Sequence, residues 1–141
     1  MYPTELVPAE VPPPRPTVLV VDDLADARDV LARLLRLGGY KSVTAEDGWA
    51  ALSAVECEAP DLVLLDVTMP DMDGVEVLRR LRDHPRWKNL PVVLFTAVED
   101  GPRLQEAGRL GIQDLIIKGG IAGRALLERI GRHVPRRSPA N

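Results

Sequence analysis

The stretch that decides the fold is Leu62–Gly74, with the sequence LVLLDVTMPDMDG. It begins with an apolar run typical of a strand buried on both faces, and Asp66 stands where this strand ends. Pro70 then turns the chain, and the pair Asp73 and Glu76 has the spacing of a helix N-cap. Ligands bind at the carboxyl ends of strands in open parallel sheets, so we interpret Asp66 as a reactive group rather than a surface charge.

Apolar runs and segments with helical periodicity alternate along the rest of the chain. We predict strands at residues 17–21, 42–45, 62–65, 92–95 and 115–117. We predict helices at residues 26–37, from 47 to before Pro60, 74–83, 102–109 and 121–133. In the first helix, the residues expected to face the core are Ala27, Val30, Leu31 and Leu34. This alternation predicts a five-stranded parallel sheet with helices on both faces, an α/β fold of the doubly wound, flavodoxin-like (βα)5 type with three α/β/α layers.

Length and composition are those of an ordinary globular chain. Its 141 residues suffice for one domain with a core, and 45% of them are hydrophobic and 28% charged. The apolar runs are far shorter than the roughly 20 residues that cross a bilayer, and residues 1–16 lack the features of a signal peptide. We therefore expect a cytoplasmic protein that binds no membrane. The single Cys57 excludes an internal disulfide, and the formal net charge of −3 gives no reason to expect nucleic acid as the main partner.

The two ends of the chain differ from its middle. Six of the 13 prolines lie in residues 1–16, which we predict to be a flexible, proline-rich arm. Residues 17–134 contain all the predicted strands and helices and form the folded domain. Arginines accumulate toward the other end, where we predict a flexible basic tail at residues 135–141.

Polar residues follow several of the predicted strands. Right-handed crossovers place the carboxyl ends of parallel strands at one edge of the sheet, which brings together Asp22, Asp23, Asp66, Thr96 and Lys118. Three carboxylates a few ångströms apart repel one another by about 4 kcal/mol per close pair, which favours binding of a cation. Oxygen ligands with open water positions suit Mg²⁺, or Mn²⁺ in its place. Between such a cation and the Lys118 ammonium group, Asp66 is suited to attack a phosphoryl group, and the Thr96 hydroxyl can hold a phosphoryl oxygen.

In their order and type, these residues resemble the receiver domains of two-component response regulators. The resemblance covers residues 17–134 and rests on VVDD at 20–23, Asp66 followed by MPDMDG at 69–74, Thr96-Ala97 and Lys118. It implies that Asp66 accepts a phosphoryl group from a phosphohistidine on a sensor histidine kinase or a histidine phosphotransfer protein. The implied ligands of Mg²⁺ are Asp23, Asp66 and the backbone carbonyl of Thr68, with Asp22 acting through water, and the groups implied to hold the acyl phosphate are Thr96 and Lys118.

Three positions affect how phosphorylation would change partner binding and how fast the aspartyl phosphate would hydrolyse. Lys118 is followed by Gly119 where receiver domains normally have proline, and Leu115 stands where they usually have a tyrosine or phenylalanine that follows the movement of the threonine. We therefore expect phosphorylation to change partner binding weakly, or through the loop near Gly119. The resemblance also implies that a downstream protein binds at the face around Leu115, Gly119 and the last helix. Val98 is apolar and cannot orient an attacking water, so we expect an aspartyl phosphate that hydrolyses slowly.

Three classes of function remain open at this point. The favoured one is a single-domain response regulator that signals by phosphorylation-dependent binding of partner proteins. The alternative is a receiver-like module that binds proteins constitutively, which Leu115 and Gly119 suggest and the intact acidic site argues against. The third is an aspartate-nucleophile phosphatase of the haloacid dehalogenase type, but that class needs a D-x-D motif after its first strand, whereas Asp22 and Asp23 are adjacent. We therefore expect that the protein is not an enzyme.

Overall fold

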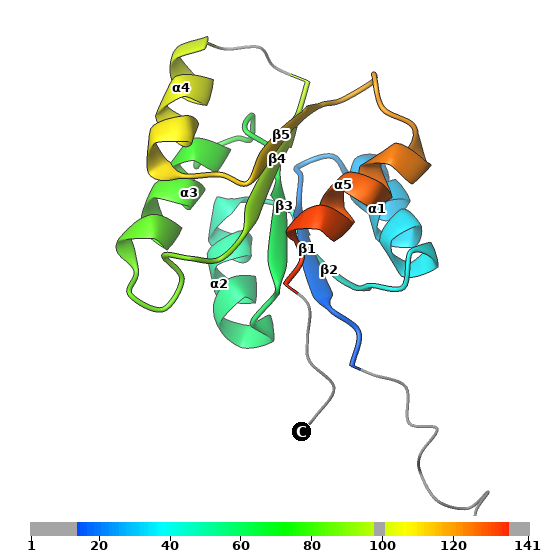
Figure 1. Cartoon of the computed structure of the whole chain (residues 1–141). Helices are drawn as coiled ribbons and strands as arrows, with labels where there is room; N and C mark the ends of the chain where they lie inside the picture. Colours follow the sequence, from blue (N-terminus) through cyan, green and yellow to red (C-terminus); the bar gives the residue numbers. More distant parts are fainter. Residues whose placement is uncertain (1–13, 98–100, 136–141) are drawn as a thin grey trace, which may run out of the picture.

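The structure is a computed structural model that describes residues 14–97 and 101–135. Residues 1–13 of the predicted arm, Val98, and residues 136–141 of the predicted tail lie outside the described residues. Strands and helices alternate in the predicted order (Figure 1). Their bounds are β1 (Thr17–Val21), α1 (Ala25–Leu37), β2 (Lys41–Ala45), α2 (Gly48–Glu58), β3 (Leu62–Leu65), α3 (Gly74–Asp83), β4 (Val92–Thr96), α4 (Gly101–Leu110), β5 (Asp114–Ile117) and α5 (Gly123–His133).

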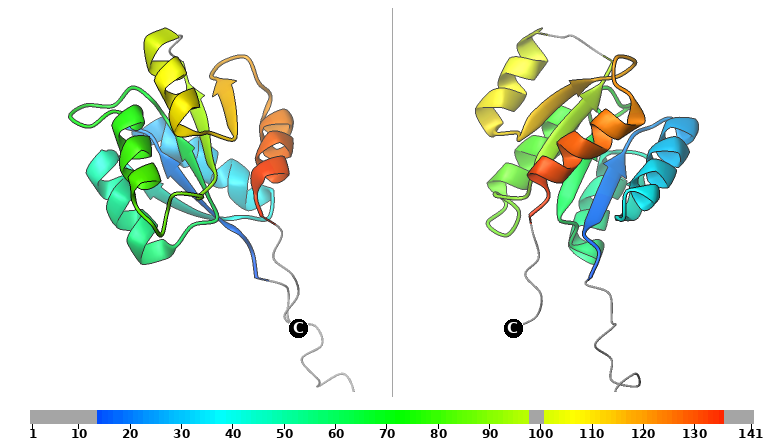
Figure 2. Two further views of the ribbon diagram at one scale, coloured as in Figure 1. Left: turned by 60° about the vertical axis from the view of Figure 1, so that its left-hand side comes forward. Right: turned by 45° about the vertical axis from the view of Figure 1, so that its right-hand side comes forward.

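The strands of the described residues form one parallel sheet in the order β2-β1-β3-β4-β5. Helices α1 and α5 cover one face of the sheet, and α2, α3 and α4 cover the other (Figures 1 and 2). This arrangement confirms the predicted flavodoxin-like α/β fold. Because β1 and β3 are neighbours with Val21 opposite Leu65, the residues that follow these two strands meet at the carboxyl edge of the sheet.

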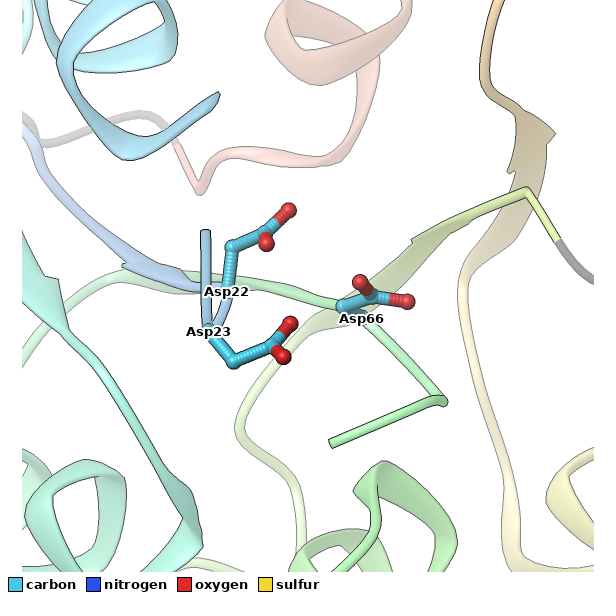
Figure 3. A group of neighbouring side chains, drawn as sticks. All are labelled: Asp22, Asp23 and Asp66. Atoms are coloured by element: carbon cyan, nitrogen blue, oxygen red, sulfur yellow. The ribbon is translucent and has the colours of Figure 1, made fainter. Parts of the chain in front are cut away.

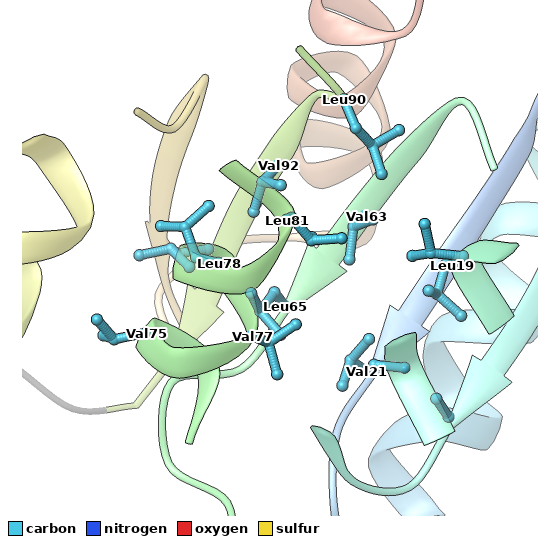
Figure 4. Close-up of a cluster of buried hydrophobic side chains, with 14 of the residues drawn as sticks. Leu19, Val21, Val63, Leu65, Val75, Val77, Leu78, Leu81, Leu90 and Val92 are labelled. Atoms are coloured by element: carbon cyan, nitrogen blue, oxygen red, sulfur yellow. The ribbon is translucent and has the colours of Figure 1, made fainter. Parts of the chain in front are cut away.

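Strands β1, β3, β4 and β5 send alternate side chains into two apolar layers. In β1 and β3, the side chains packed with α2, α3 and α4 are Leu19, Val21, Val63 and Leu65 (Figure 4). The intervening side chains, which pack with α1 and α5, are Val18, Val20, Leu62 and Leu64. Both faces of these strands are buried, which explains why their sequences are continuously apolar rather than alternating.

The buried face of α1 differs from the prediction. Leu31, Ala32 and Leu35 are its buried residues, whereas Val30 is 65% exposed. The helix lies at the border of the sheet over β1 and β2, so only a narrow stripe of side chains meets the core (Figure 1). Six element starts also differ: α5 begins at Gly123, two residues later than predicted, and α1, β2, α2, α4 and β5 each begin one residue away from the predicted position. None of the helices in the described part of the chain combines the length and apolar character needed to span a membrane.

Candidate functional site

Three aspartates meet at the carboxyl edge of the sheet (Figure 3). Asp22 and Asp23 follow β1, and Asp66 follows β3, the neighbour of β1 in the sheet. One carboxylate oxygen from each residue lies within 4.8 Å of the other two. Asp22 is 1% exposed and Asp66 is 7% exposed, whereas Asp23 is open to solvent. The structure therefore brings together the acidic residues that the sequence placed at strand ends.

Backbone amides fix one oxygen of each buried carboxylate. Oδ1 of Asp22 accepts a hydrogen bond from the backbone N–H of Leu24 at 3.0 Å, and Oδ1 of Asp66 accepts one from the N–H of Thr68 at 3.2 Å. These local turns form because the short aspartate side chain reaches the amide two residues on. The other oxygen of each carboxylate, Oδ2, accepts from Nζ of Lys118, at 2.5 Å for Asp22 and 3.1 Å for Asp66.

Lys118 supplies the positive charge of the site. It follows β5, and its backbone N–H donates to the carbonyl of Thr96 at 2.9 Å. Burial by itself would lower the pKa of Lys118, but the hydrogen bonds to Asp22 and Asp66 outweigh this effect and raise the pKa above the ordinary value. The ammonium group is therefore charged at neutral pH. It also lies 5.6 Å from the centre of the Phe95 ring, within the range of a cation–π contact.

The residues present fit a divalent cation. Three carboxylates and one ammonium group leave two negative charges uncompensated, which is the charge that Mg²⁺ balances. The side-chain donors are all oxygens, and the exposure of Asp23 leaves one side of the cluster open for water ligands. Within residues 14–97 and 101–135, this is the one group of three or more His, Cys, Asp or Glu side chains with ligand atoms so close.

The two predicted threonines border this cluster. Thr96 ends β4, the other neighbour of β3, two residues beyond Leu94, which is opposite Leu65. Its side chain is fully buried. Thr68 lies in the turn that follows Asp66 and is exposed, and the role of its carbonyl as a metal ligand stays a prediction.

A close backbone contact between Gly74 and residues 66–67 fixes the loop that follows Asp66. Helix α3 begins at Gly74, whose backbone N–H donates to the Val67 carbonyl at 2.8 Å. A Cβ atom at Gly74 would lie 2.2 Å from the backbone oxygen of Asp66, so another residue fits only if this backbone moves. Oδ1 of Asp73 accepts from the backbone N–H of Glu76 at 2.9 Å, which confirms the helix cap predicted from the sequence.

One residue near the site was not predicted from the sequence. Arg103, in the first turn of α4, reaches the loop after Asp66 and donates to the Val67 carbonyl and to Asp73. No sequence signal marks it, because an arginine on a surface helix normally faces solvent.

The two departures from the family pattern are visible in the backbone and the core. Gly119 has φ +86°, a left-handed conformation that proline cannot adopt because its ring holds φ near −65°. Leu115 is half-buried and packs against the apolar cluster on the α2–α4 side of the sheet. The predicted weak readout stays a prediction.

Comparison with known proteins establishes the family. Residues 18–131 match the model of the response regulator receiver domain. The chain belongs to this family. This receiver domain is 40% identical over 116 residues to the response regulator protein FleR of Pseudomonas aeruginosa, covering 82% of the chain and 24% of FleR. It is 34% identical over 109 residues to the two-component response regulator ORR3 of Oryza sativa subsp. indica, covering 77% of the chain and 83% of ORR3.

Solved structures agree with this assignment. The chemotaxis response regulator CheY4 of Vibrio cholerae has a TM-score of 0.77 and 28% identity, with 84% of this chain and 98% of that chain covered. A putative response regulator from Chloroflexus aurantiacus has a TM-score of 0.79 and 30% identity, with 87% and 100% covered. The receiver domain described here spans only about a quarter of the length of FleR, and 20% of the response regulator PleD of Caulobacter vibrioides.

Proposed function

We propose that this receiver domain accepts a phosphoryl group on Asp66 from a phosphohistidine of a sensor histidine kinase or a histidine phosphotransfer protein. The setting of Asp66 carries the proposal, because its buried carboxylate lies 3.1 Å from Nζ of Lys118 and within 4.8 Å of carboxylate oxygens of Asp22 and Asp23. A cluster of like charges with two buried members costs folding free energy, and such clusters are typical of functional sites. The phosphoryl group then shifts an existing conformational equilibrium and so controls partner binding.

The residues that would hold Mg²⁺ or Mn²⁺ are Asp23, Asp66 and the Thr68 carbonyl, with Asp22 acting through water. The bound metal would neutralise charge on the oxygens of the transferring phosphoryl group. A carboxylate oxygen of Asp66 forms the new bond to phosphorus while the bond from phosphorus to the histidine nitrogen breaks. The electron pair of the broken bond stays on that nitrogen, and the ring leaves as neutral imidazole because its other nitrogen carries a proton in the phosphohistidine that reacts. Lys118 balances the charge that remains beside Asp66, and the Thr96 hydroxyl donates a hydrogen bond to the phosphoryl group.

Asp66 would act as an acceptor that is itself modified, and the domain would not turn over a substrate as an enzyme. Slow hydrolysis of the aspartyl phosphate is part of this proposal, and it depends on Val98, which lies outside the described residues. A cytoplasmic location also belongs to the proposal, since phosphohistidine made from ATP would be the donor.

The proposed output is binding of a downstream protein at the face around Leu115, Gly119 and α5, with no role for nucleic acid. A second candidate is constitutive protein binding at the same face without phosphorylation. Leu115 favours this candidate, because it has neither the ring nor the hydroxyl with which an aromatic residue follows a phosphoryl group. The two candidates differ in one measurable respect, which is whether phosphorylation changes the affinity for the partner.

The test is intact mass measurement after incubation with acetyl phosphate or a phosphohistidine donor and Mg²⁺. We expect the wild-type protein to gain the mass of one phosphoryl group and Asp66→Asn to gain none. Asp71→Asn, which changes an exposed acid in the same loop, is the matched control and should be modified like the wild type. Removal of the metal with a chelator should prevent the gain. A folded wild-type protein that gains no mass from either donor would refute the proposal.

A further inference from the structure

The side chain of Arg103 spans the loop between Asp66 and Gly74. Its Nη2 atom donates to the carbonyl oxygen of Val67 at 3.3 Å and to Oδ2 of Asp73 at 2.7 Å. These two acceptors stand at the beginning and the end of the loop. A single guanidinium group from α4 therefore contacts both ends of the loop.

Both acceptors of Arg103 are themselves fixed to the start of α3. The Val67 carbonyl also accepts from the backbone N–H of Gly74 at 2.8 Å, and Oδ1 of Asp73 accepts from the N–H of Glu76 at 2.9 Å. Hydrogen bonds at both ends of the loop leave it little conformational freedom. A displacement of the loop therefore acts on Arg103, and through it on the first turn of α4.

We infer that Arg103 is a positioning residue that links the state of Asp66 to α4; the inference rests on the proposed function. Phosphorylation of Asp66 adds negative charge beside Val67, and the guanidinium group stays charged under all ordinary conditions. The hydrogen bond of Arg103 to the neutral Val67 carbonyl is longer than its charge-assisted bond to Asp73, so it is the weaker of these and breaks first. The added charge draws Arg103 toward Asp66 and moves α4 with it.

This link does not need an aromatic residue on β5. Leu115, on β5, packs in the apolar layer and offers no polar group to the site. Arg103 instead connects the β3–α3 loop with α4. The surface that changes on phosphorylation therefore includes α4, which packs in the same apolar cluster as Leu115.

A second arginine provides the matched control. Arg79, on α3, forms ion pairs with Glu106 of α4 and with Glu76 of its own helix. Its partners in these pairs are helix residues rather than members of the loop. Arg79→Gln therefore weakens the contact between α3 and α4 without touching the loop directly.

The test follows backbone amide signals of the full chain by NMR, with Mg²⁺ and the phosphoryl mimic beryllofluoride. In the wild type we expect beryllofluoride to shift the amide signal of Gly108 in α4. Arg103→Gln should reduce this shift to less than half. Arg103→Lys should give an intermediate value, because lysine keeps the positive charge but its side chain is one atom shorter and cannot reach both acceptors from the same backbone position. Arg79→Gln should keep the wild-type shift.

Three results would overturn the inference: an unshifted Gly108 signal in the wild type, a full shift in Arg103→Gln, or an equal loss in Arg79→Gln. The amide of Thr68, which donates to Asp66, separates this failure from failure of the proposed function. If beryllofluoride shifts the Thr68 signal in the wild type, the site binds the mimic. The shift of the Gly108 signal then tests only the inferred role of Arg103. If the Thr68 signal does not move, the proposed function itself fails.

Discussion

At the residue scale, Gly74 has the most direct control over Asp66, because a Cβ atom there would lie 2.2 Å from the Asp66 carbonyl oxygen. We predict that Gly74→Ala lowers the free energy of unfolding by about 1–3 kcal/mol, the usual cost of overpacking, and slows phosphorylation by acetyl phosphate. Urea unfolding and intact mass measure the two effects. Gly108→Ala is the control, since its Cβ would meet nothing within 4 Å, and it should stabilise α4 by roughly 0.5–1 kcal/mol. Wild-type phosphorylation kinetics in Gly74→Ala would contradict the prediction.

Individual residues also show why part of the site was predictable. Asp22, Asp66 and Lys118 each follow an apolar strand, and the parallel topology alone decides that such residues meet. The partners of Arg103 depend instead on how α4 packs against α3. In sequence, an arginine that crosses to another element looks the same as one that faces solvent.

At the scale of secondary structure elements, the start of a helix was predicted to within one residue where a capping side chain marks it. Helix α3 was placed correctly at Gly74, because Asp73 caps it. Helix α5 was placed two residues too early, and its N-cap residue Ala122 makes no side-chain cap hydrogen bond that the sequence could have shown. For α1, periodicity predicted the helix but not that Val30 is exposed, since that depends on which part of the sheet lies beneath it.

The end of α2 allows a test of backbone strain. Ala59 closes this helix in the left-handed conformation, with φ 45° and ψ 59°, and its N–H donates to the Val55 carbonyl. The left-handed conformation costs an alanine about 1–2 kcal/mol, whereas glycine adopts it without this cost. Glycine also has more conformational freedom in the unfolded chain, which offsets part of the gain in stability. We predict that Ala59→Gly raises the free energy of unfolding by about 0.5–1 kcal/mol, measured in urea. Ser53→Gly, at an exposed position inside α2, is the control and should lower the free energy of unfolding by about 0.5 kcal/mol. A loss of stability in both variants would rule out backbone strain at Ala59.

At the scale of the whole molecule, stability in acid depends on how α5 is attached to the sheet. Hydrogen bonds from Arg129 hold the pKa of Asp114 below its ordinary value of 3.8, against the effect of burial and with help from His133. The unfolded chain therefore binds this proton more readily, so the stabilisation is complete above pH 3.8 and is lost as the pH falls through the lower folded pKa.

We predict that Asp114→Asn removes part of this pH dependence. Between neutral pH and about pH 3, the free energy of unfolding should fall less in this variant than in the wild type. Urea unfolding at a series of pH values measures the difference. Glu58→Gln, at the exposed end of α2, is the control and should follow the wild-type curve. Parallel curves for Asp114→Asn and the wild type would show that the contact with Arg129 is too weak to matter.

The exposed apolar surface of α1 is a candidate docking surface for the proposed phosphodonor. Val30 is 65% exposed and lines a groove of about 420 Å³ between α1 and α5, which reaches Phe95 and Lys118. If Asp66 accepts a phosphoryl group as proposed, the donor approaches from this edge of the sheet, and we expect a helix of the donor to pack on Val30 while its phosphohistidine reaches the site.

We predict that Val30→Lys slows phosphoryl transfer from a phosphohistidine protein at least tenfold, about 1.4 kcal/mol in transition-state stabilisation, and leaves the reaction with acetyl phosphate unchanged. Leu37→Lys, two helical turns further along α1 and about 10 Å away, should affect neither reaction, although Leu37 is 86% exposed. Transfer rates from the two donors, measured by intact mass, separate docking from chemistry. Equal slowing with both donors would mean that Val30 supports the site itself, because acetyl phosphate is too small to use the groove.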